Sequence, residues 1–189
     1  MTKKYLLIAF LGPDGAGKTS YINILKKKLI HKNINFTNYH FVPAIFKKKN
    51  VIIVKNPHSK KKRSKFLSFC KLIFMMIKCH FFILIDRLFS KEIIIFDRYA
   101  HDILIDPIRY RFNLQQKFTK KILNLFPQPD LWIIVVNKPS VIWKRKKEVK
   151  YQILKKQIIS YQLFKKKNSN SIFCKKYDDI EKIFKFLTI

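Results

Sequence analysis

The stretch GPDGAGKT, residues 12–19, contains all three glycines of a chain of 189 residues, at Gly12, Gly15 and Gly17. Three glycines scattered at random would fall this close together on the order of once in 500 sequences, and glycine is favoured where the backbone takes a positive φ or approaches a ligand closely. The spacing is that of G-x-x-x-x-G-K-[ST], a loop whose backbone amides bind phosphate. The clustering therefore predicts a phosphate-binding turn.

A phosphate-binding loop has to follow a strand and open a helix, and both flanks meet this condition. Residues 4–11, KYLLIAFL, form a nearly continuous apolar run that is typical of a buried parallel strand. Beyond the loop, Ile22, Leu25 and Leu29 recur at helical spacing. The alternative is an ordinary strand–turn–helix that carries the motif by chance. We expect the following residues to bind nucleotide phosphate: Gly12, Pro13, Asp14, Gly15, Ala16, Gly17, Lys18, Thr19 and Ser20.

The formal net charge of +30 is the second unusual property of the chain, with 41 lysines and arginines against 11 acidic residues. It has two explanations: an anionic partner such as nucleic acid or a membrane surface, or compositional drift toward residues with A/T-rich codons. The lysines are spread along the whole chain and do not form one stripe, which favours drift. A surface this basic should still bind polyanions weakly, with a steep dependence on salt.

Cysteines and targeting segments give an expectation for the compartment. Cys70, Cys79 and Cys174 are odd in number and lack CxxC spacing, which favours free thiols in a reducing cytosol. The N-terminus leads directly into the first expected strand, so we expect no signal peptide and a cytoplasmic location.

The stretch 66–85, FLSFCKLIFMMIKCHFFILI, is apolar enough to raise the question of a membrane span. Lys71, Lys78 and His80 interrupt it, whereas a span needs about 20 predominantly apolar residues. We expect a mostly buried helix and no stable membrane insertion; a helix lying in the membrane interface is the alternative.

Apolar strands alternate with helical patterns along the chain. Strands are expected at 4–11, 35–42, 92–96, 131–136 and 171–174, with a further short strand at 51–54, and helices at 18–31, 64–89, 113–126, 140–147, 151–166 and 178–187. This order predicts one α/β domain spanning 1–189, with three α/β/α layers around a five-stranded parallel sheet. Ligands of such sheets bind at the carboxyl ends of the strands.

Phosphoryl transfer from ATP needs a lysine on the phosphates, ligands for Mg²⁺ and positive charge for the transition state. By motif position Lys18 meets the first need and Thr19 supplies a hydroxyl to the metal. Asp97 ends the hydrophobic strand EIIIF and is the candidate carboxylate for the metal, directly or through water. Asp97 could also be a strand-capping residue, but Arg98 beside it and the phosphate loop favour a role in transfer.

Three stretches resemble one family. GPDGAGKTS, a hydrophobic strand ending in FDRY, and PQPDLWIIVVNKP followed by a basic helix are similar to the thymidylate-kinase-like P-loop kinases. The resemblance implies a P-loop NTPase fold of the nucleoside monophosphate kinase type, with ATP and Mg²⁺ as donor and metal and thymidylate as the usual acceptor. It implies that Asp14 lies toward the acceptor, that Arg98 holds the acceptor's phosphate and that Asp97 lies by the metal. Because relatives are often dimers, it also implies a homodimer.

The family has a mobile lid after the fourth strand, which corresponds here to residues of about 140–152. Some members carry an arginine in the phosphate loop where this chain has Gly15, and others supply that charge from the lid. The resemblance therefore implies that Arg145, with Lys144, Lys146 and Lys147 beside it, supplies the charge. The alternative is a solvated basic helix.

The chain departs from the family in the parts that bind the base. HFVPAIF follows the second strand where thymidylate kinases have an arginine-glutamate-proline turn, AHDILIDPIRYRF follows FDRY, and Asn137 stands where an acid is common. Asp102, Asp106, Arg109 and Arg111 could form the acceptor pocket, or a helix cap with a salt-bridge cluster.

Several functions therefore stay open at this point. A kinase of nucleoside monophosphates is favoured, with dTMP as the best guess for the acceptor. A kinase of a phosphorylated sugar or a nucleic-acid end, and a non-catalytic basic protein that binds nucleic acid with a vestigial nucleotide site, are the alternatives.

Overall fold

A computed structural model of the protein describes residues 5–41, 61–89, 92–175 and 179–187. Five strands form one sheet with every neighbouring pair parallel, in the order β2-β3-β1-β4-β5. The strands are β1 (Leu6–Leu11), β2 (Phe36–His40), β3 (Ile93–Asp97), β4 (Leu131–Val135) and β5 (Ser171–Cys174). The five-stranded parallel sheet predicted from the sequence is confirmed.

The register of the sheet brings the end of β3 beside the phosphate loop. Phe10 in β1 lies opposite Asp97, and His40 at the end of β2 lies opposite the same residue from the other side. The central strand β1 is buried between β3 and β4, as its continuous apolar sequence requires. Backbone pairing thereby places the phosphate loop and Asp97, which are far apart in the sequence, at the same edge of the sheet.

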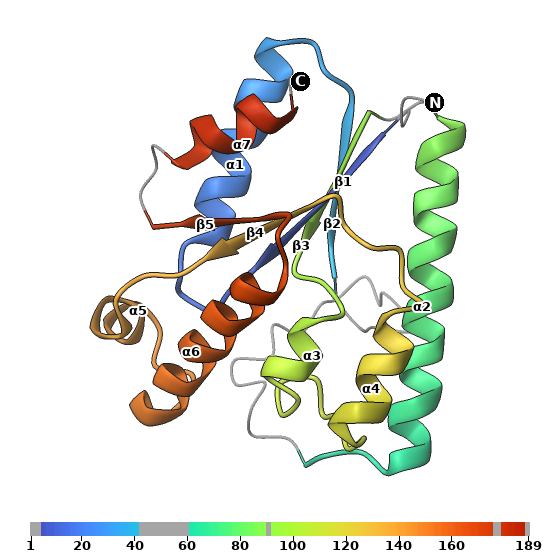
Figure 1. The fold of residues 1–189 in the computed structure, drawn as a ribbon, viewed down its shortest axis with the longest axis vertical. Helices are drawn as coiled ribbons and strands as arrows, with labels where there is room; N and C mark the ends of the chain where they lie inside the picture. Colours follow the sequence, from blue (N-terminus) through green and yellow to red (C-terminus); the bar gives the residue numbers. More distant parts are fainter. Residues whose placement is uncertain (1–4, 42–60, 90–91, 176–178, 188–189) are drawn as a thin grey trace, which may run out of the picture.

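Seven helices cover the sheet in the described part of the chain: α1 (Lys18–His31), α2 (Lys65–Leu88), α3 (Asp102–Ile105), α4 (Gln116–Leu123), α5 (Pro139–Arg145), α6 (Tyr151–Lys167) and α7 (Asp179–Leu187). Figure 1 shows α1 and α7 together on one side of the sheet, with α2, α3, α4 and α6 on the other. Right-handed crossovers in this strand order produce that division into three layers.

Two helical segments differ from expectation. The helix expected at 113–126 is shorter, and one turn of helix, α3, follows β3 where none was expected. A single turn is too short to give a periodic pattern, so its existence could not be inferred from spacing. The strand expected at 51–54 lies outside the described residues.

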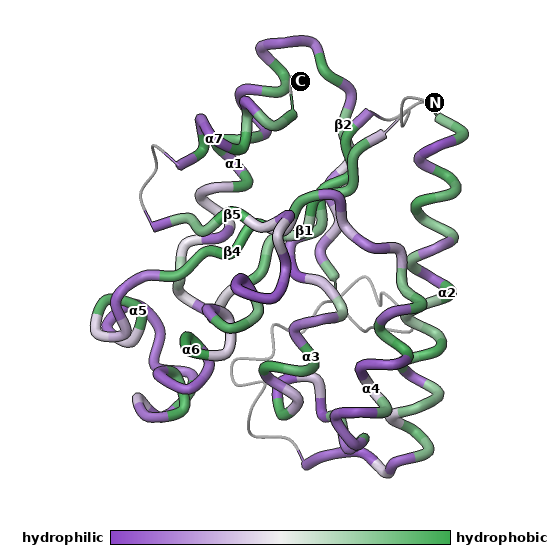
Figure 2. Tube along the Cα trace, viewed as in Figure 1, coloured by the Kyte–Doolittle hydropathy of each residue, from purple (hydrophilic) through white to green (hydrophobic). Residues whose placement is uncertain are grey.

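Helix α2 exposes many apolar side chains and buries a lysine. It begins after Ser64, whose hydroxyl accepts from the Leu67 amide at 3.2 Å. Lys71 is buried, with Nζ donating to the Tyr110 carbonyl at 2.9 Å, while much of the exposed face is apolar. Figure 2 shows hydrophobic colour along most of α2. The expectation of a mostly buried helix was wrong, since only 33% of its most apolar 18 residues are buried.

By length and composition α2 is also the one helix in the described ranges that could cross a membrane. The three cysteines are free, as predicted; Cys79 and Cys174 are buried and Cys70 is exposed.

Candidate active site

The phosphate loop connects β1 to α1, and its glycines have positive φ as the motif predicts. Gly12 has φ 144°, and a Cβ there would lie 2.1 Å from the Val135 carbonyl oxygen. Gly15 has φ 79°, and a Cβ there would meet Lys146 Cβ at 3.1 Å and the Ile142 carbonyl at 3.2 Å. Gly12 lets the loop pass close to β4, and Gly15 lets the segment after α5 approach the loop.

The loop delivers the chain into the N-terminus of α1. Gly17, with φ 102°, is the N-cap, and among the described residues no side chain caps this end of the helix. The first amides of a helix lack intrahelical partners and the helix dipole favours anions there. Thr19 and Ser20 are exposed at this end, while Pro13 and Ala16 are buried beneath the loop. The arrangement suits a phosphate chain lying along the loop.

Lys18 folds back over the loop. Its ammonium donates to the Gly12 carbonyl at 2.8 Å and to the Pro13 carbonyl at 2.9 Å, and the side chain is buried. Burial, followed by repulsion from the Arg98 guanidinium, lowers the pKa of Lys18 to about 7. An anion at the loop would restore the charged form, so Lys18 has the position and chemistry to contact a phosphate.

Asp97 lies at the carboxyl end of β3 beside the loop. Its Oδ2 lies 3.1 Å from His40 Nδ1, and its Oδ1 is buried with no partner among the described atoms. Burial acts to raise the pKa of Asp97, but the His40 hydrogen bond and the charges of Lys18 and Arg98 outweigh it, so the pKa lies below its usual value. The result is an ionised carboxylate with one unused oxygen.

Arg98 turns inward immediately after Asp97. Its φ is 71°, which a non-glycine residue adopts only where the surroundings hold it. The buried guanidinium donates to Asp102 at 2.7 Å, to Asp14 from the loop, and to the Gly12 carbonyl at 3.4 Å. Burial acts to lower the pKa of Arg98, yet the charge of Asp102 raises it above its ordinary value.

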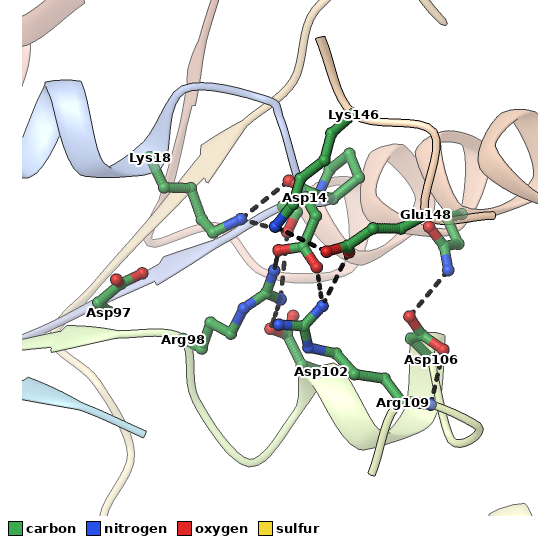
Figure 3. Close-up of polar contacts among 12 residues, drawn as sticks. Asp14, Lys18, Asp97, Arg98, Asp102, Asp106, Arg109, Lys146 and Glu148 are labelled. Atoms are coloured by element: carbon green, nitrogen blue, oxygen red, sulfur yellow. Dashed lines mark hydrogen bonds and ion pairs between the residues drawn. The ribbon is translucent and has the colours of Figure 1, made fainter. Parts of the chain in front are cut away.

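Arg109 approaches the same loop aspartate from the segment after α3. Its guanidinium pairs with Asp14 and lies 3.5 Å from Glu148 Oε2. Glu148 in turn pairs with Lys146 at 2.7 Å. Figure 3 shows the resulting line of alternating charges, from the segment after α5 to the phosphate loop.

Asp102 is enclosed by polar partners behind Arg98. It is fully buried, accepting from Arg98 and from the Tyr161 hydroxyl at 2.9 Å, with the Tyr110 hydroxyl at 3.4 Å. Asp102 lies behind Arg98 and does not line the hollow, an arrangement that agrees with the salt-bridge alternative more than with contact to an acceptor. The hydroxyl of Tyr161 in α6 is a buried partner that the sequence pattern did not indicate.

Asp106 and Arg111 have different binding partners, and Arg111 lies outside the site. Asp106 accepts from the Arg109 amide at 3.2 Å and from Gln157 Nε2 at 2.9 Å, which ties the segment after α3 to α6. Arg111 donates instead to the Lys61 carbonyl at 2.9 Å and does not line the site. Of the cluster expected from the sequence, Arg109 alone faces the phosphate loop directly.

The segment expected to form a lid covers the loop. Helix α5 ends at Arg145, whose Nη1 would lie 3.9 Å from a Cβ on Gly17. Arg145 itself is exposed and Lys146 crosses Gly15. These contacts place positive side chains of this segment directly above the phosphate loop.

The candidates surround one hollow of about 670 Å³ at the carboxyl ends of the strands. That volume falls within the usual range for small-molecule sites. Its lining carries five basic side chains, two carboxylates and a histidine, a balance that suits a polyphosphate. The lining residues are Asp14, Gly15, Gly17, Lys18, Thr19, Ser20, His40, Asp97, Arg98, Arg109, Arg145 and Lys146.

Sequence reasoning missed two residues of this site. His40 is a lone histidine with no motif around it, and only strand pairing brings it to Asp97. Glu148 was not singled out, although a signal existed, since it is the one acid in the basic run from Lys144 to Lys150.

No protein-family model matches the sequence, and no curated protein matches it. Among solved structures, thymidylate kinase from Candida albicans is similar in fold, with a TM-score of 0.61 and 17% sequence identity, over 97% of this chain and 91% of that chain. The fold implied by the resemblance, a P-loop α/β fold of the thymidylate kinase type, is confirmed. At this identity the likeness shows the fold alone.

Proposed function

We propose that this protein, which has the fold of the thymidylate kinases, is a cytosolic enzyme that transfers the γ-phosphate of ATP to a nucleoside monophosphate. dTMP is the best candidate for the acceptor, giving dTDP and ADP. The observation that supports the proposal most directly is the convergence of the phosphate loop, Asp97 and Arg98 on one positively charged hollow.

The donor's phosphates would lie on the loop. The amides from Asp14 to Thr19 and the N-terminus of α1 would hold them, because unpaired amides and the helix dipole both favour anions. Lys18 would leave the carbonyls of Gly12 and Pro13 and bind the β- and γ-phosphates.

A Mg²⁺ ion fits the residues present. Thr19 is exposed at the start of α1, and Asp97 has a buried oxygen without a partner, whereas Mg²⁺ prefers a few oxygen ligands together with phosphate and water. The hydroxyl of Thr19 and the carboxylate of Asp97, the latter directly or through water, would hold the metal. Bound there, Mg²⁺ would neutralise charge on the transferring phosphate.

The acceptor would bind on the opposite side of the transferred phosphate. Arg98 and Arg109 each contact Asp14 and have guanidinium groups that match a phosphate in geometry. We propose that the acceptor's phosphate binds the guanidinium groups of these two arginines, and that the Asp14 carboxylate accepts a hydrogen bond from a hydroxyl of the acceptor. Asp102 and Tyr161 would keep Arg98 in place during this exchange.

Residues 140–152 would act as the lid of the single domain. Arg145 would supply the charge that other kinases of this type place in the loop, since Gly15 leaves room only for the lid backbone and Lys146. Closure would exclude water, so that the acceptor and not solvent receives the phosphate.

The test is transfer of label from γ-³²P-ATP with Mg²⁺ to a panel of acceptors: nucleoside monophosphates, phosphorylated sugars, and oligonucleotides with free 5′ ends. The panel is kept broad because the similar Candida albicans enzyme is described as having broad substrate specificity. We expect a labelled nucleoside diphosphate, absent with Lys18→Ala, while far-UV circular dichroism shows the variant folded.

Two outcomes would contradict the proposal. Label on a sugar phosphate or a nucleic-acid end would keep the kinase chemistry and replace the acceptor. No label on any acceptor, together with polyanion binding that is unchanged in Lys18→Ala, would favour the non-catalytic alternative. The net charge of +30 is the observation that suggests this alternative.

A further inference from the structure

His40 in β2 holds the Asp97 carboxylate from the neighbouring strand. Its Nδ1 lies 3.1 Å from Asp97 Oδ2, and the register of β2 and β3 sets the two residues opposite each other. The Phe41 amide donates to the Asp97 carbonyl at 2.9 Å, which continues the pairing one residue further. Because side chains alternate between the faces of a sheet along each strand, this register brings the two side chains together on one face.

The contact has a defined donor. Asp97 is ionised, because its pKa lies below its usual value, and an ionised carboxylate can only accept hydrogen bonds. The proton of the contact is therefore on Nδ1 of His40, which donates to Oδ2. Histidine can donate this bond without adding a full positive charge, whereas lysine, the commonest residue of this chain, cannot.

Packing does not account for a histidine at this position. The side chain is 54% exposed, and it lines both the hollow and an adjacent apolar pocket. A contact this exposed contributes little to the stability of the fold. Its main consequence is the position of the Asp97 carboxylate.

Holding one oxygen of Asp97 also fixes the other. The carboxylate is planar, so a hydrogen bond at Oδ2 restricts rotation of the whole group. Oδ1 is buried and has no partner among the described atoms, and Asp97 lines the hollow together with Lys18 and Thr19. Carboxylates that bind metals are generally hydrogen-bonded by outer residues that keep them oriented. His40 occupies the place of such an outer residue.

We propose that His40 is the positioning residue of Asp97, and that its Nδ1–H group holds Oδ2 so that Oδ1 stays available to the Mg²⁺ of the bound nucleotide. The inference rests on the proposed function in one respect, because it takes Asp97 as a ligand of that metal. It does not depend on which acceptor is used. In this role His40 touches neither the donor nor the acceptor and acts through Asp97 alone.

The first test measures metal binding and needs no acceptor. Mn²⁺ replaces Mg²⁺, the non-hydrolysable analogue AMPPNP replaces ATP, and free Mn²⁺ is measured by electron paramagnetic resonance. His40→Ala should weaken the binding of Mn²⁺ to the protein–AMPPNP complex roughly tenfold, the lower end of the usual cost of losing a group that orients a metal ligand. The affinity for AMPPNP without metal should stay unchanged, because the phosphate loop is intact.

Two amides separate the hydrogen bond from the size of the ring. An asparagine side chain places an N–H close to the position of Nδ1, whereas the N–H of a glutamine lies near the position of Nε2. His40→Asn should therefore keep most of the affinity for Mn²⁺, and His40→Gln should lose it.

The matched control is His80→Ala. His80 is an exposed histidine of α2 whose Nδ1 lies 3.0 Å from the Met76 carbonyl oxygen, and it does not line the hollow. This variant should bind Mn²⁺ as tightly as the wild type does.

The second test is a double-mutant cycle. Because His40 acts through Asp97, His40→Ala should have no further effect on Mn²⁺ binding in a protein that already carries Asp97→Ala. With a labelled acceptor in hand, His40→Ala should also lower kcat roughly tenfold and leave the KM of the acceptor unchanged.

Three results would overturn the proposal. The first is equal affinity for Mn²⁺ in the wild type and in His40→Ala. The second is an equal loss in His40→Asn and His40→Gln, which would assign the effect to the ring and not to the hydrogen bond. The third is a loss from His40→Ala that persists beside Asp97→Ala. Far-UV circular dichroism checks that each variant is folded, and the contrast between His40→Asn and His40→Gln decides alone where His40→Ala is not.

Failure of the proposed function has a different signature. If no acceptor is labelled but the Mn²⁺ titrations still separate His40→Asn from His40→Gln, the role of His40 stands and the assigned reaction falls. If an acceptor is labelled and the titrations show no difference, the reaction stands and the role of His40 falls. No binding of Mn²⁺ by the wild-type complex would overturn the role of His40 together with that of Asp97.

Discussion

Arg109 Nη1 lies 3.5 Å from Glu148 Oε2, which joins the segment after α3 to the segment between α5 and α6. The two residues are 39 positions apart in the chain and belong to parts with different proposed tasks, binding of the acceptor and closure over the donor. The contact gives those two parts a direct link, and it is continued to the phosphate loop by the pair between Arg109 and Asp14.

Removing the charge of Glu148 tests this link. Glu148→Gln should lower kcat/KM for the acceptor about fivefold, because a partly exposed ion pair contributes roughly 1 kcal/mol, and should raise the ratio of ATP hydrolysis to transfer. Glu181→Gln, which removes the exposed pair with Lys28, is the control and should leave both quantities unchanged. Equal behaviour of the two variants would show that the link has no role in turnover.

The lowered pKa of Lys18 predicts proton uptake when ATP binds. In the free protein the pKa is about 7, and the phosphates should return it toward its usual value, so at pH 8 binding should take up close to one proton. Affinity for ATP should accordingly fall as the pH rises from 7 to 9. Calorimetry in two buffers of different ionisation enthalpy measures the uptake, which Lys18→Arg should abolish because arginine stays charged.

Asp97 should be needed for transfer and not for folding. Asp97→Ala should reduce kcat on the order of 100- to 1,000-fold, the usual cost of losing one group that stabilises the transition state. Because the pKa of Asp97 lies below its usual value, the activity of the wild type should show no titration of this carboxylate above pH 5. Thermal unfolding of the variant within a few degrees of wild type would confirm that the loss is chemical; full activity would exclude the role.

Two glycines of the loop should respond differently to alanine. Gly12→Ala meets the backbone oxygen of Val135 at 2.1 Å and should lower the midpoint of thermal unfolding by more than about 5 °C, as a loss of about 2 kcal/mol does in a domain of this size. Gly15→Ala meets Lys146 and Ile142 at 3.1 to 3.2 Å and should reduce kcat with a smaller loss of stability, because the proposed lid would shift to accommodate the methyl group. The reverse order of stabilities would contradict the positions described for β4 and the lid.

His101 should make the fold sensitive to acid. It is buried against Trp132, with ring centroids 4.7 Å apart, and burial lowers its pKa from 6.5 to about 4. Between these values the unfolded chain binds a proton that the folded chain does not, so stability falls as the pH drops from 6.5 to 4, by up to about 3 kcal/mol.

Urea unfolding at several pH values measures this loss of stability between pH 6.5 and 4. The loss should disappear in His101→Phe, which keeps the aromatic packing. It should persist in His31→Gln, at an exposed position of α1. A pH dependence that is the same in all three proteins would assign the acid sensitivity to other groups.

The sequence by itself determined the phosphate loop, the parallel sheet and the positions of Lys18, Asp97 and Arg98. These depend on local physics: glycine is required at positive φ, a buried parallel strand must be apolar throughout, and the carboxyl ends of such strands share one edge. Sequence positions alone were therefore enough to bring the loop and the end of β3 together.

Only the tertiary structure decided what surrounds these residues. Asp102 and Arg109 are both charged residues in one short segment, and the packing of α6 is what buries the first behind Arg98 and leaves the second facing the loop. The sequence marks Glu148 only as an isolated acid in a basic run, and its pairing with Arg109, 39 positions away, is decided by the tertiary structure. Helix α2 is apolar on nearly every side, so periodicity could not tell which stripe the sheet would cover; burial is a property of the neighbours that a helix meets and not of its own sequence.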